Sequence, residues 1–196
     1  MDIKLSDFIW TNKSLENDFC DHVVKKFDKD GRALQGVVGK DRRLELELKN
    51  SWDLPISRYD DWKEEDEVFA SSINISLNEY WEYLYDLGSM FIPHTPTTEY
   101  KDQGYQVKKY EPDGYYHWHH DYVFDEGFGV RLLTFIWYLN DVSEKGCTEF
   151  CDGTKINPEK GKVLIFPANW NYAHRGCIPE DGKKYIATGW LYQKDK

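Results

Sequence analysis

The sequence predicts a mainly β protein with supporting α-helices, in which the N-terminal half supports a C-terminal β-barrel or jelly roll. Apolar residues recur at helical spacing in two stretches before residue 98, whereas beyond Pro96 short apolar runs alternate with turn signals. The length of 196 residues suits one domain. We therefore expect a single domain over residues 1–196, with a helical supporting region over 1–98 and a jelly-roll core over 99–196.

Two helices are expected in the supporting region. Apolar side chains recur every three or four positions in residues 14–27, and Asn12 or Ser14 is the expected N-cap. The second helix follows the acidic run KEEDE at 63–67, whose charge suits the positive end of a helix dipole, and its apolar positions extend from Phe69 to Phe91. Residues 30–60 mix charged residues with glycine, which is typical of short strands or loops.

Seven strands are expected in the core, because seven short runs of β-forming residues are bounded by turn signals. They lie near residues 104–110, 115–121, 131–140, 147–151, 163–167, 172–177 and 183–192. The runs 132–139 and 163–167 are apolar on both faces apart from Thr134, which indicates strands that are covered on both sides. We expect the N-terminal helices to provide one of these covers.

The charge and the terminal sequence favour some classes of protein over others. The net charge is −10, with 25 basic against 35 acidic residues, and an acidic surface repels phosphate backbones, so we expect no nucleic-acid partner. The first ten residues lack the apolar segment of a signal peptide, and no stretch reaches the ~18 apolar residues of a membrane helix. We therefore expect a cytoplasmic protein without a membrane partner, whose four cysteines are free thiols.

The segment HWHHD at 117–121 contains two candidate metal ligands. His119 and Asp121 lie two residues apart, so on a strand both side chains project from the same face. A third ligand from another strand, for which His174 is the candidate, would complete a site of two histidines and one carboxylate. Such a site leaves coordination positions open, which is the arrangement found in non-haem Fe(II) oxygenases.

Lys184 is the candidate for binding an anion. By strand alternation it shares a face with Ile186, Thr188 and Trp190, and a cation that points into an apolar barrel needs a negative partner, which a bound carboxylate would provide. The alternative is that Lys184, beside Lys183, lies on a turn in water. On the run 131–140, Thr134 and Tyr138 share a face and offer two hydroxyls to the same carboxylate.

Five ordered segments between Gln106 and Tyr192 resemble the 2-oxoglutarate-dependent Fe(II) dioxygenases, and within them the prolyl 4-hydroxylase-like branch. They are YEPDGYYHWHHD at 110–121, RLLTFIWYLNDV at 131–142, GCTEF at 146–150, PEKGKVLIFP at 158–167, and the distal His174 followed by Lys184. One departure is Cys147, which stands where the family has the second glycine of a Gly-Gly pair. The resemblance implies a double-stranded β-helix, a cupin-like jelly roll, packed against the N-terminal helices.

The resemblance also implies roles for individual residues. Fe(II) would be bound by His119, Asp121 and His174. The cosubstrate 2-oxoglutarate would be held by Lys184 at its distal carboxylate, with Tyr138 and Thr134 assisting and Tyr110 near its chelating end. The substrate side of the pocket would be lined by Tyr116, Arg131 and Trp190, and Tyr122 in the loop 122–130 is a candidate cover. O2 would be the second cosubstrate, and ascorbate is a candidate reductant.

The implied activity is hydroxylation of an unactivated C–H bond, with release of succinate and CO2. A peptidyl proline is the leading substrate by resemblance, and a free amino acid or another small metabolite is the alternative. The presence of Asp121 argues against halogenation, because the related halogenases carry a small residue at that position. Two other classes remain open, a non-catalytic cupin-like binding module and a Zn(II) hydrolase, and neither requires both the triad and Lys184.

Overall fold

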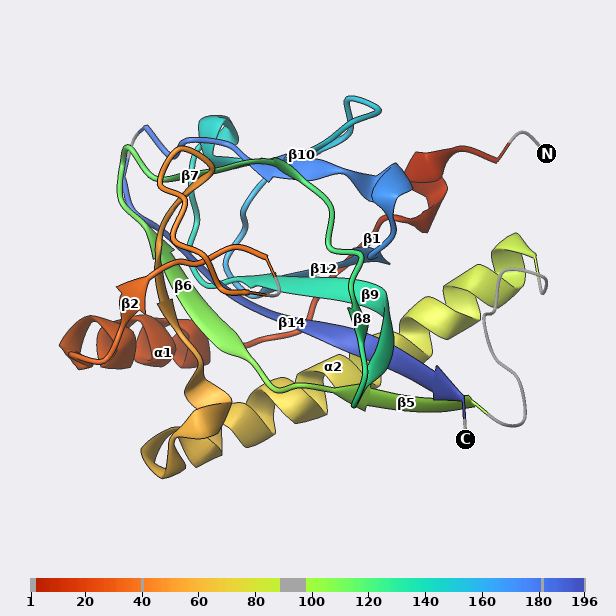
Figure 1. The fold of residues 1–196 in the computed structure, drawn as a ribbon, viewed down its shortest axis with the longest axis horizontal. Coiled ribbons are helices and arrows are strands. Elements are labelled where there is room, and N and C mark those ends of the chain that lie inside the picture. The colour runs from red at the N-terminus through yellow and green to blue at the C-terminus, as the bar shows by residue number, and fades with distance from the viewer. Residues whose placement is uncertain (1–2, 40, 89–97, 181, 196) are drawn as a thin grey trace.

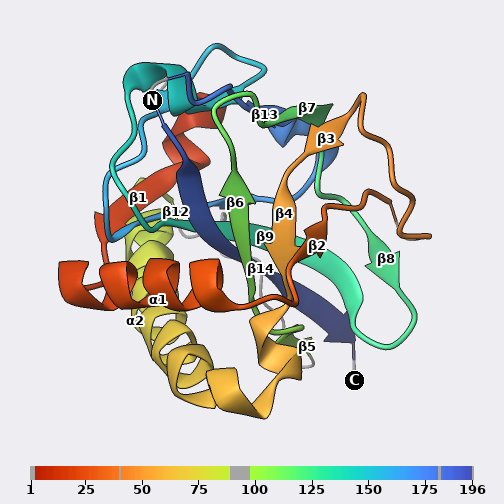
Figure 2. The ribbon, with the colours of Figure 1, turned by 90° about the vertical axis from the view of Figure 1, so that its left-hand side faces the viewer.

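The computed structural model describes residues 3–39, 41–88, 98–180 and 182–195. Two antiparallel β-sheets lie face to face, and two long helices cover the outer face of the larger sheet (Figures 1 and 2). This arrangement is the predicted jelly roll with supporting helices. Among the described residues, neither helix combines the length and the apolar composition needed to cross a membrane.

The larger sheet has the strand order β1-β12-β9-β14-β6-β4-β2, with β5 paired to β14 and β8 paired to β9. Its strands are β1 (Trp10–Lys13), β2 (Leu34–Gln35), β4 (Trp52–Leu54), β5 (Thr98–Asp102), β6 (Gln106–Tyr110), β8 (Phe124–Asp125), β9 (Gly129–Tyr138), β12 (Lys162–Pro167) and β14 (Lys184–Asp195). The smaller sheet has the order β11-β10-β13-β7-β3. Its strands are β3 (Lys49–Asn50), β7 (Tyr115–His119), β10 (Thr148–Phe150), β11 (Lys155–Ile156) and β13 (His174–Gly176).

The helices α1 (Asn17–Lys29) and α2 (Lys63–Leu87) pack on the outer face of the larger sheet, as expected from its two-sided apolar strands. On α2, Phe69 packs against Trp137 of β9 with ring centroids 5.0 Å apart. On α1, Phe27 meets Tyr185 of β14 edge-on at 6.1 Å. Phe135 and Trp137 therefore belong to the helix-facing core, whereas the alternate residues Ile136 and Tyr138 belong to a second apolar cluster between the two sheets.

The start of α1 differs from the expectation. The N-cap is Glu16, which makes no side-chain cap bond, so neither Asn12 nor Ser14 caps the helix. The backbone amides of Ser14 and Leu15 instead donate to the carbonyl oxygen of Gly161, and this contact keeps the chain extended before the helix begins. Gly161 has φ +82°, and a Cβ there would lie 2.2 Å from the Leu15 oxygen, so the position requires glycine.

The Ser14 side chain is used for packing between elements. Its Oγ accepts hydrogen bonds from the indole Nε1 of Trp137 at 3.1 Å and from the hydroxyl of Ser72 at 3.0 Å. Ser14 thus connects the start of α1 to α2 and to β9. The second helix begins at Lys63, as the acidic run predicted, and ends at Leu87; Phe91 lies outside the described residues.

The supporting region also contains strands for which the sequence predicted no definite bounds. β1 pairs with β12, β4 pairs with β6, and β3 pairs with β7, so residues before 98 extend both sheets. Between residues 30 and 60, where short strands or loops were expected, the structure has the short strands β2, β3 and β4 joined by loops. β5, β8 and β11 were not predicted, because each is short or follows no alternating apolar pattern. Within the loop 122–130, β8 turns back to pair with the start of β9.

Candidate active site

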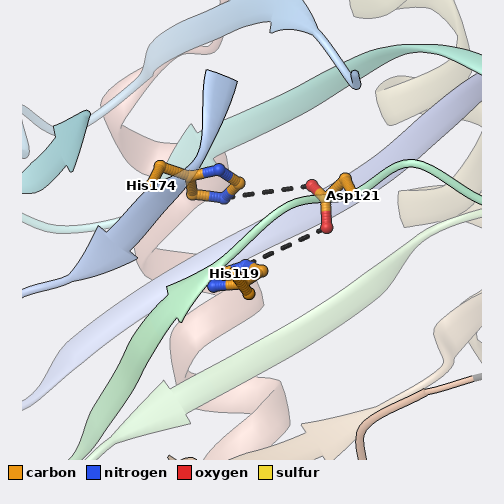
Figure 3. A group of neighbouring side chains, drawn as sticks. All are labelled: His119, Asp121 and His174. Carbon is orange, nitrogen blue, oxygen red and sulfur yellow. Dashed lines mark ion pairs between the residues drawn. The ribbon is translucent and has the colours of Figure 1, made fainter. Parts of the chain in front are cut away.

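His119, Asp121 and His174 converge between the two sheets (Figure 3). β7 and β13 are neighbours in the smaller sheet, and their register places His174 directly opposite His119. Asp121 Oδ1 lies 3.9 Å from His119 Nε2, and Asp121 Oδ2 lies 3.9 Å from His174 Nε2. The expectation that all three side chains form one site is confirmed.

The reason for the convergence is different from the one expected. The strand β7 ends at His119, so Asp121 does not share a strand face with it. The Asp121 side chain is instead held by Thr134 of β9, whose Oγ1 donates a hydrogen bond of 2.8 Å to Asp121 Oδ2. Thr134 therefore positions the carboxylate, and its expected role at the cosubstrate stays a prediction.

Backbone carbonyls set the tautomers of the two histidines. Nδ1 of His119 lies 2.8 Å from the His117 carbonyl oxygen, and Nδ1 of His174 lies 3.0 Å from the Tyr172 carbonyl oxygen. A carbonyl oxygen can only accept, so each Nδ1 carries the proton and donates. Each Nε2 then presents a lone pair toward Asp121, which is the tautomer a metal ligand needs.

The protonation states fit a bound cation. Burial, the facing His174 and the more distant Lys108 lower the pKa of His119 against the opposite effect of Asp121, and burial lowers the pKa of His174, so both rings are neutral at pH 7. Burial alone would raise the pKa of Asp121, but the protonated forms of His174 and His119, the Arg131 guanidinium and the Thr134 hydroxyl outweigh it and lower that pKa, so the carboxyl group is ionised at pH 7. Lone pairs and a carboxylate thus face one another without a proton between them, an arrangement that a divalent cation would stabilise.

Lys184 is buried, with 3% of its surface exposed, so the alternative of a turn lysine in water is wrong. It lies opposite Tyr110 in the β14–β6 register, and its Nζ lies 5.6 Å from the Tyr110 ring and 5.9 Å from the Tyr138 ring. Its hydrogen bond goes to the carbonyl oxygen of Gly146 at 2.8 Å. Burial lowers the pKa of Lys184 to about 8, because no carboxylate of the described residues forms an ion pair with it.

The other residues expected at the cosubstrate surround this lysine. Tyr110 and Tyr138 are both buried, and both belong to the apolar cluster between the sheets. The Tyr138 hydroxyl donates to Thr148 Oγ1 over 2.7 Å, so its proton is held by a neighbouring strand of the smaller sheet. Lys184, Tyr110 and Tyr138 thus form a buried group with one positive charge, which suits the carboxylate of a dicarboxylic acid.

The residues expected on the substrate side lie nearer the triad. Tyr116 stacks on the His119 ring with centroids 3.5 Å apart. The Arg131 guanidinium lies 4.0 Å from the Trp190 ring, and its Nε donates to the Tyr192 hydroxyl at 2.6 Å. Tyr122 is 49% exposed just beyond the triad, so its role as a substrate cover stays a prediction.

Two buried lysines and one partly buried aspartate near the site were not singled out from the sequence. Lys49 and Asp53 form an ion pair of 2.6 Å, and Lys49 Nζ lies 5.2 Å from the Tyr116 ring. Lys108 is buried on β6. The alternation of residues 106–110 could have identified Lys108, since it shares a strand face with Tyr110, which was already a candidate.

Comparison with known proteins agrees with this geometry. Residues 105–192 match the family model described as the 2OG-Fe(II) oxygenase superfamily. Prolyl 4-hydroxylase 1 of Arabidopsis thaliana is 32% identical over 117 residues, which cover 45% of this chain and 40% of that protein. Prolyl 4-hydroxylase subunit alpha-1 of Gallus gallus is 30% identical over 105 residues, which cover 45% of this chain and 20% of that protein. The chain thus spans less than half the length of these curated relatives.

Solved structures show the same fold over nearly the whole chain. A viral collagen prolyl hydroxylase from Paramecium Bursaria Chlorella virus-1, in a 2OG complex, has a TM-score of 0.64 at 23% identity, covering 94% of this chain and 95% of that one. A prolyl hydroxylase from Trichoplax adhaerens, in complex with a hypoxia inducible factor oxygen degradation domain peptide fragment, has a TM-score of 0.72 at 14% identity, covering 95% and 84%. The predicted double-stranded β-helix is confirmed.

The family-model match lies over the β core that contains the triad and Lys184, and the fold matches extend to the supporting helices. Both agree with the five segments of the sequence and with the grouping of their residues in one site. Residues 105–192 of this chain therefore match the 2OG-Fe(II) oxygenase superfamily, and the chain is similar in sequence to prolyl 4-hydroxylases.

Proposed function

We propose that this protein is an Fe(II)- and 2-oxoglutarate-dependent dioxygenase that hydroxylates a proline residue in a peptide. The observation that carries the proposal is the pairing of two features between the same two sheets. Three unprotonated ligand atoms converge at one point beside the apolar cluster between the sheets, and the buried Lys184, which has no ion-pair partner among the described residues, lies against Tyr110 and Tyr138 of the same cluster. The proposed chemistry requires both a site for a divalent metal and a site for a dicarboxylate. Neither a Zn(II) hydrolase nor a non-catalytic binding module requires both.

The residues present fit the metal. His119, Asp121 and His174 would hold Fe(II) through Nε2, carboxylate oxygen and Nε2, and the remaining coordination positions would be open. Backbone carbonyls at Nδ1 keep the imidazoles oriented, and Thr134 keeps the carboxylate in place. When bound, Fe(II) and 2-oxoglutarate supply the oxidation, in which O2 converts the cosubstrate to succinate and CO2 and one oxygen atom enters the substrate.

The protein itself would bind, orient and exclude water. Lys184 would pair with the distal carboxylate of 2-oxoglutarate, between the rings of Tyr110 and Tyr138, which exclude water from this pair. Tyr116, stacked on His119, and Trp190, packed under Arg131, would form apolar walls for the substrate ring. A dry pocket of this kind protects the reaction from side reactions with water.

The proline substrate is supported by the relatives, of which the solved Trichoplax adhaerens structure is a prolyl hydroxylase with a peptide bound. The sequence similarity to prolyl 4-hydroxylases of plant and animal origin points the same way. A free amino acid as substrate remains the alternative, since the fold accommodates both.

Anaerobic addition of Fe(II) and 2-oxoglutarate tests the proposal. We expect a visible charge-transfer band, and on admission of O2 we expect succinate together with a proline peptide that has gained one oxygen atom. A Zn(II) hydrolase or a binding module would give neither signal. Absence of both the band and succinate would reject the dioxygenase, whereas succinate without peptide oxidation would reject only the peptidyl-proline substrate.

A further inference from the structure

Lys108 is a second buried cation beside the active site, and the proposed reaction leaves it without a role. It is the third residue of β6 and pairs with Ile186 of β14, which belongs to the apolar cluster between the sheets. Its neighbour Val107 faces the helix-covered core, so Lys108 points to the opposite side, the side of the triad. Only 6% of its surface is exposed.

The ammonium group of Lys108 forms no ion pair or hydrogen bond within the described residues; the charges of Asp53 and Asp121 act on it from farther away, and burial outweighs them and lowers its pKa. The nearest carboxylate across the strand pair, Asp53, is already bound to Lys49 at 2.6 Å and to the Ser51 hydroxyl at 2.8 Å. Lys108 Nζ instead lies over the Trp190 ring, 5.4 Å from the ring centroid. Leaving a buried cation unpaired is costly, and proteins do so where a ligand supplies the missing charge.

Further polar groups gather at the same place. The indole Nε1 of Trp190 is buried and, within the part of the chain that the structure describes, has no hydrogen-bond acceptor. Arg131 lies against the same ring at 4.0 Å and makes its polar contacts to the Tyr192 hydroxyl and the Asp121 carbonyl oxygen, neither of which is a carboxylate side chain. Two cations, Lys108 and Arg131, thus lie against the Trp190 ring, and the indole of the same residue offers a free donor. The net charge of the chain, by contrast, is −10.

This cluster is separate from the cosubstrate end of the pocket. Lys184 pairs with Tyr110 in the β14–β6 register, whereas Lys108 pairs with Ile186, farther along β14 toward Trp190. Lys184 contacts Tyr110 and Tyr138, and Lys108 contacts Trp190. One dicarboxylate whose distal end is held by Lys184 and whose other end chelates the metal has no carboxylate left for Lys108.

We infer that Lys108 binds a carboxylate of the prime substrate, so that the enzyme selects a proline with a negative charge close to its ring. This inference rests on the proposed dioxygenase function. Two sources can provide that charge: the side chain of an acidic residue beside a peptidyl proline, or the α-carboxylate of free proline. Burial lowers the pKa of Lys108 to about 8, so at pH 7 the charged form that such a substrate requires is still the main one.

Matched substrates and two matched variants test the inference. The variants are Lys108→Met, which removes the charge with little loss of volume, and Lys109→Met, the adjacent residue on the opposite face of β6, where Lys109 pairs with Glu111. The substrates are proline peptides with Glu or Gln at each position within two residues of the proline, and L-proline against L-prolinamide. Oxygen incorporation is followed by mass spectrometry at varied substrate concentration.

We expect the wild-type protein to prefer the acid over its amide by about 10- to 150-fold in kcat/KM, the range of one charge-assisted pair. Lys108→Met should reduce this preference to about one, Lys109→Met should retain it, and neither variant should change the KM for 2-oxoglutarate. Whether the peptide acids or proline itself show the preference identifies the source of the carboxylate. Equal use of acid and amide by the wild type, or a raised 2-oxoglutarate KM in Lys108→Met, would overturn the inference.

Two further measurements separate this inference from the proposed function. The charge-transfer band and uncoupled succinate formation need no prime substrate, so absence of both in the wild type would reject the dioxygenase, whereas their presence with equal use of acid and amide would reject only the role of Lys108. Thermal unfolding without any ligand tests Lys108 directly, because replacing an unpaired buried charge by an apolar side chain should raise the Tm of Lys108→Met above wild type. A lowered Tm in a variant with native circular dichroism would mean that Lys108 has a structural partner, and would contradict the inference.

Discussion

Thr134 donates a hydrogen bond of 2.8 Å to Asp121, and this bond joins the two sheets at the active site. Thr134 lies on β9 of the larger sheet, whereas Asp121 follows the end of β7 in the smaller sheet. Because Asp121 lies outside regular structure, its backbone is not held by strand pairing. The side-chain bond therefore contributes to the orientation of the carboxylate toward His119 and His174.

Replacing Thr134 by valine tests this positioning role. The change keeps the shape but removes the donor, so we expect metal affinity to fall about 10- to 100-fold while the fold is kept. Calorimetric titration with Mn(II) measures the affinity. Thr188→Val is a suitable control, because Thr188 is equally buried and its hydroxyl bonds the Phe135 carbonyl oxygen instead of a ligand. Equal affinities of the two variants would show that Thr134 does not position Asp121.

Replacing His174 by alanine should abolish metal-dependent succinate formation. The side chain provides one of three ligand atoms and is fully enclosed between the sheets, so nothing else in the described site can take its place. Mn(II) titration of the variant should show no binding at the concentrations that saturate the wild type. His120→Ala is the control, since His120 adjoins the site in sequence but lies outside the triad. A His174→Ala protein that still forms succinate would remove this residue from the metal site.

Replacing Lys184 by methionine should chiefly raise the requirement for 2-oxoglutarate. The variant loses a charge-assisted pair of ~1.5–3 kcal/mol, which corresponds to a KM about 10- to 150-fold higher. The neighbouring Lys183→Met provides the control, because Lys183 is half-exposed and lies 3.8 Å from Glu111. Steady-state succinate formation at varied 2-oxoglutarate distinguishes the two variants, and an unchanged KM in Lys184→Met would contradict its proposed role.

The affinity for 2-oxoglutarate should also depend on pH. Burial lowers the pKa of Lys184 to about 8 in the free protein, and only the protonated form, which dominates below that pH, attracts a carboxylate. The KM should therefore be nearly constant from pH 6 to 7 and rise about tenfold between pH 7 and 9. The Lys184→Met variant should lack this rise. A wild-type KM that stays flat to pH 9 would mean that the lysine does not lose its proton in this range.

Much of the site followed from residue order alone. The five motif segments lie in sequence at spacings that the family shares, and strand alternation correctly predicted an inward-facing Lys184 and a common face for Thr134 and Tyr138. Alternation is a local property, because successive side chains of a strand must point to opposite faces. The same reasoning correctly predicted that helices cover the apolar outer face of β9 and β12.

Other features depend on residues that are distant in the chain. Ser14 does not cap its helix, because the backbone before the helix bonds Gly161 and the hydroxyl meets Trp137. The Thr134 hydroxyl donates to Asp121, a partner that strand alternation does not indicate. In each case a local preference is outcompeted by a partner from another element, which no local pattern contains.

By itself, the sequence determined the fold class, the resemblance of the β core to the 2-oxoglutarate/Fe(II) oxygenases, the three residues of the candidate metal site and the inward lysine, since these follow from motif order and strand period. Only the tertiary structure decided which donors hold the ligands and which charges remain unpaired. Pairing depends on distances between side chains of separate strands, and those are set by sheet order and register. Lys108 is the clearest case, because its charge is ordinary in the sequence and becomes informative only once Asp53 is seen to be bound to Lys49.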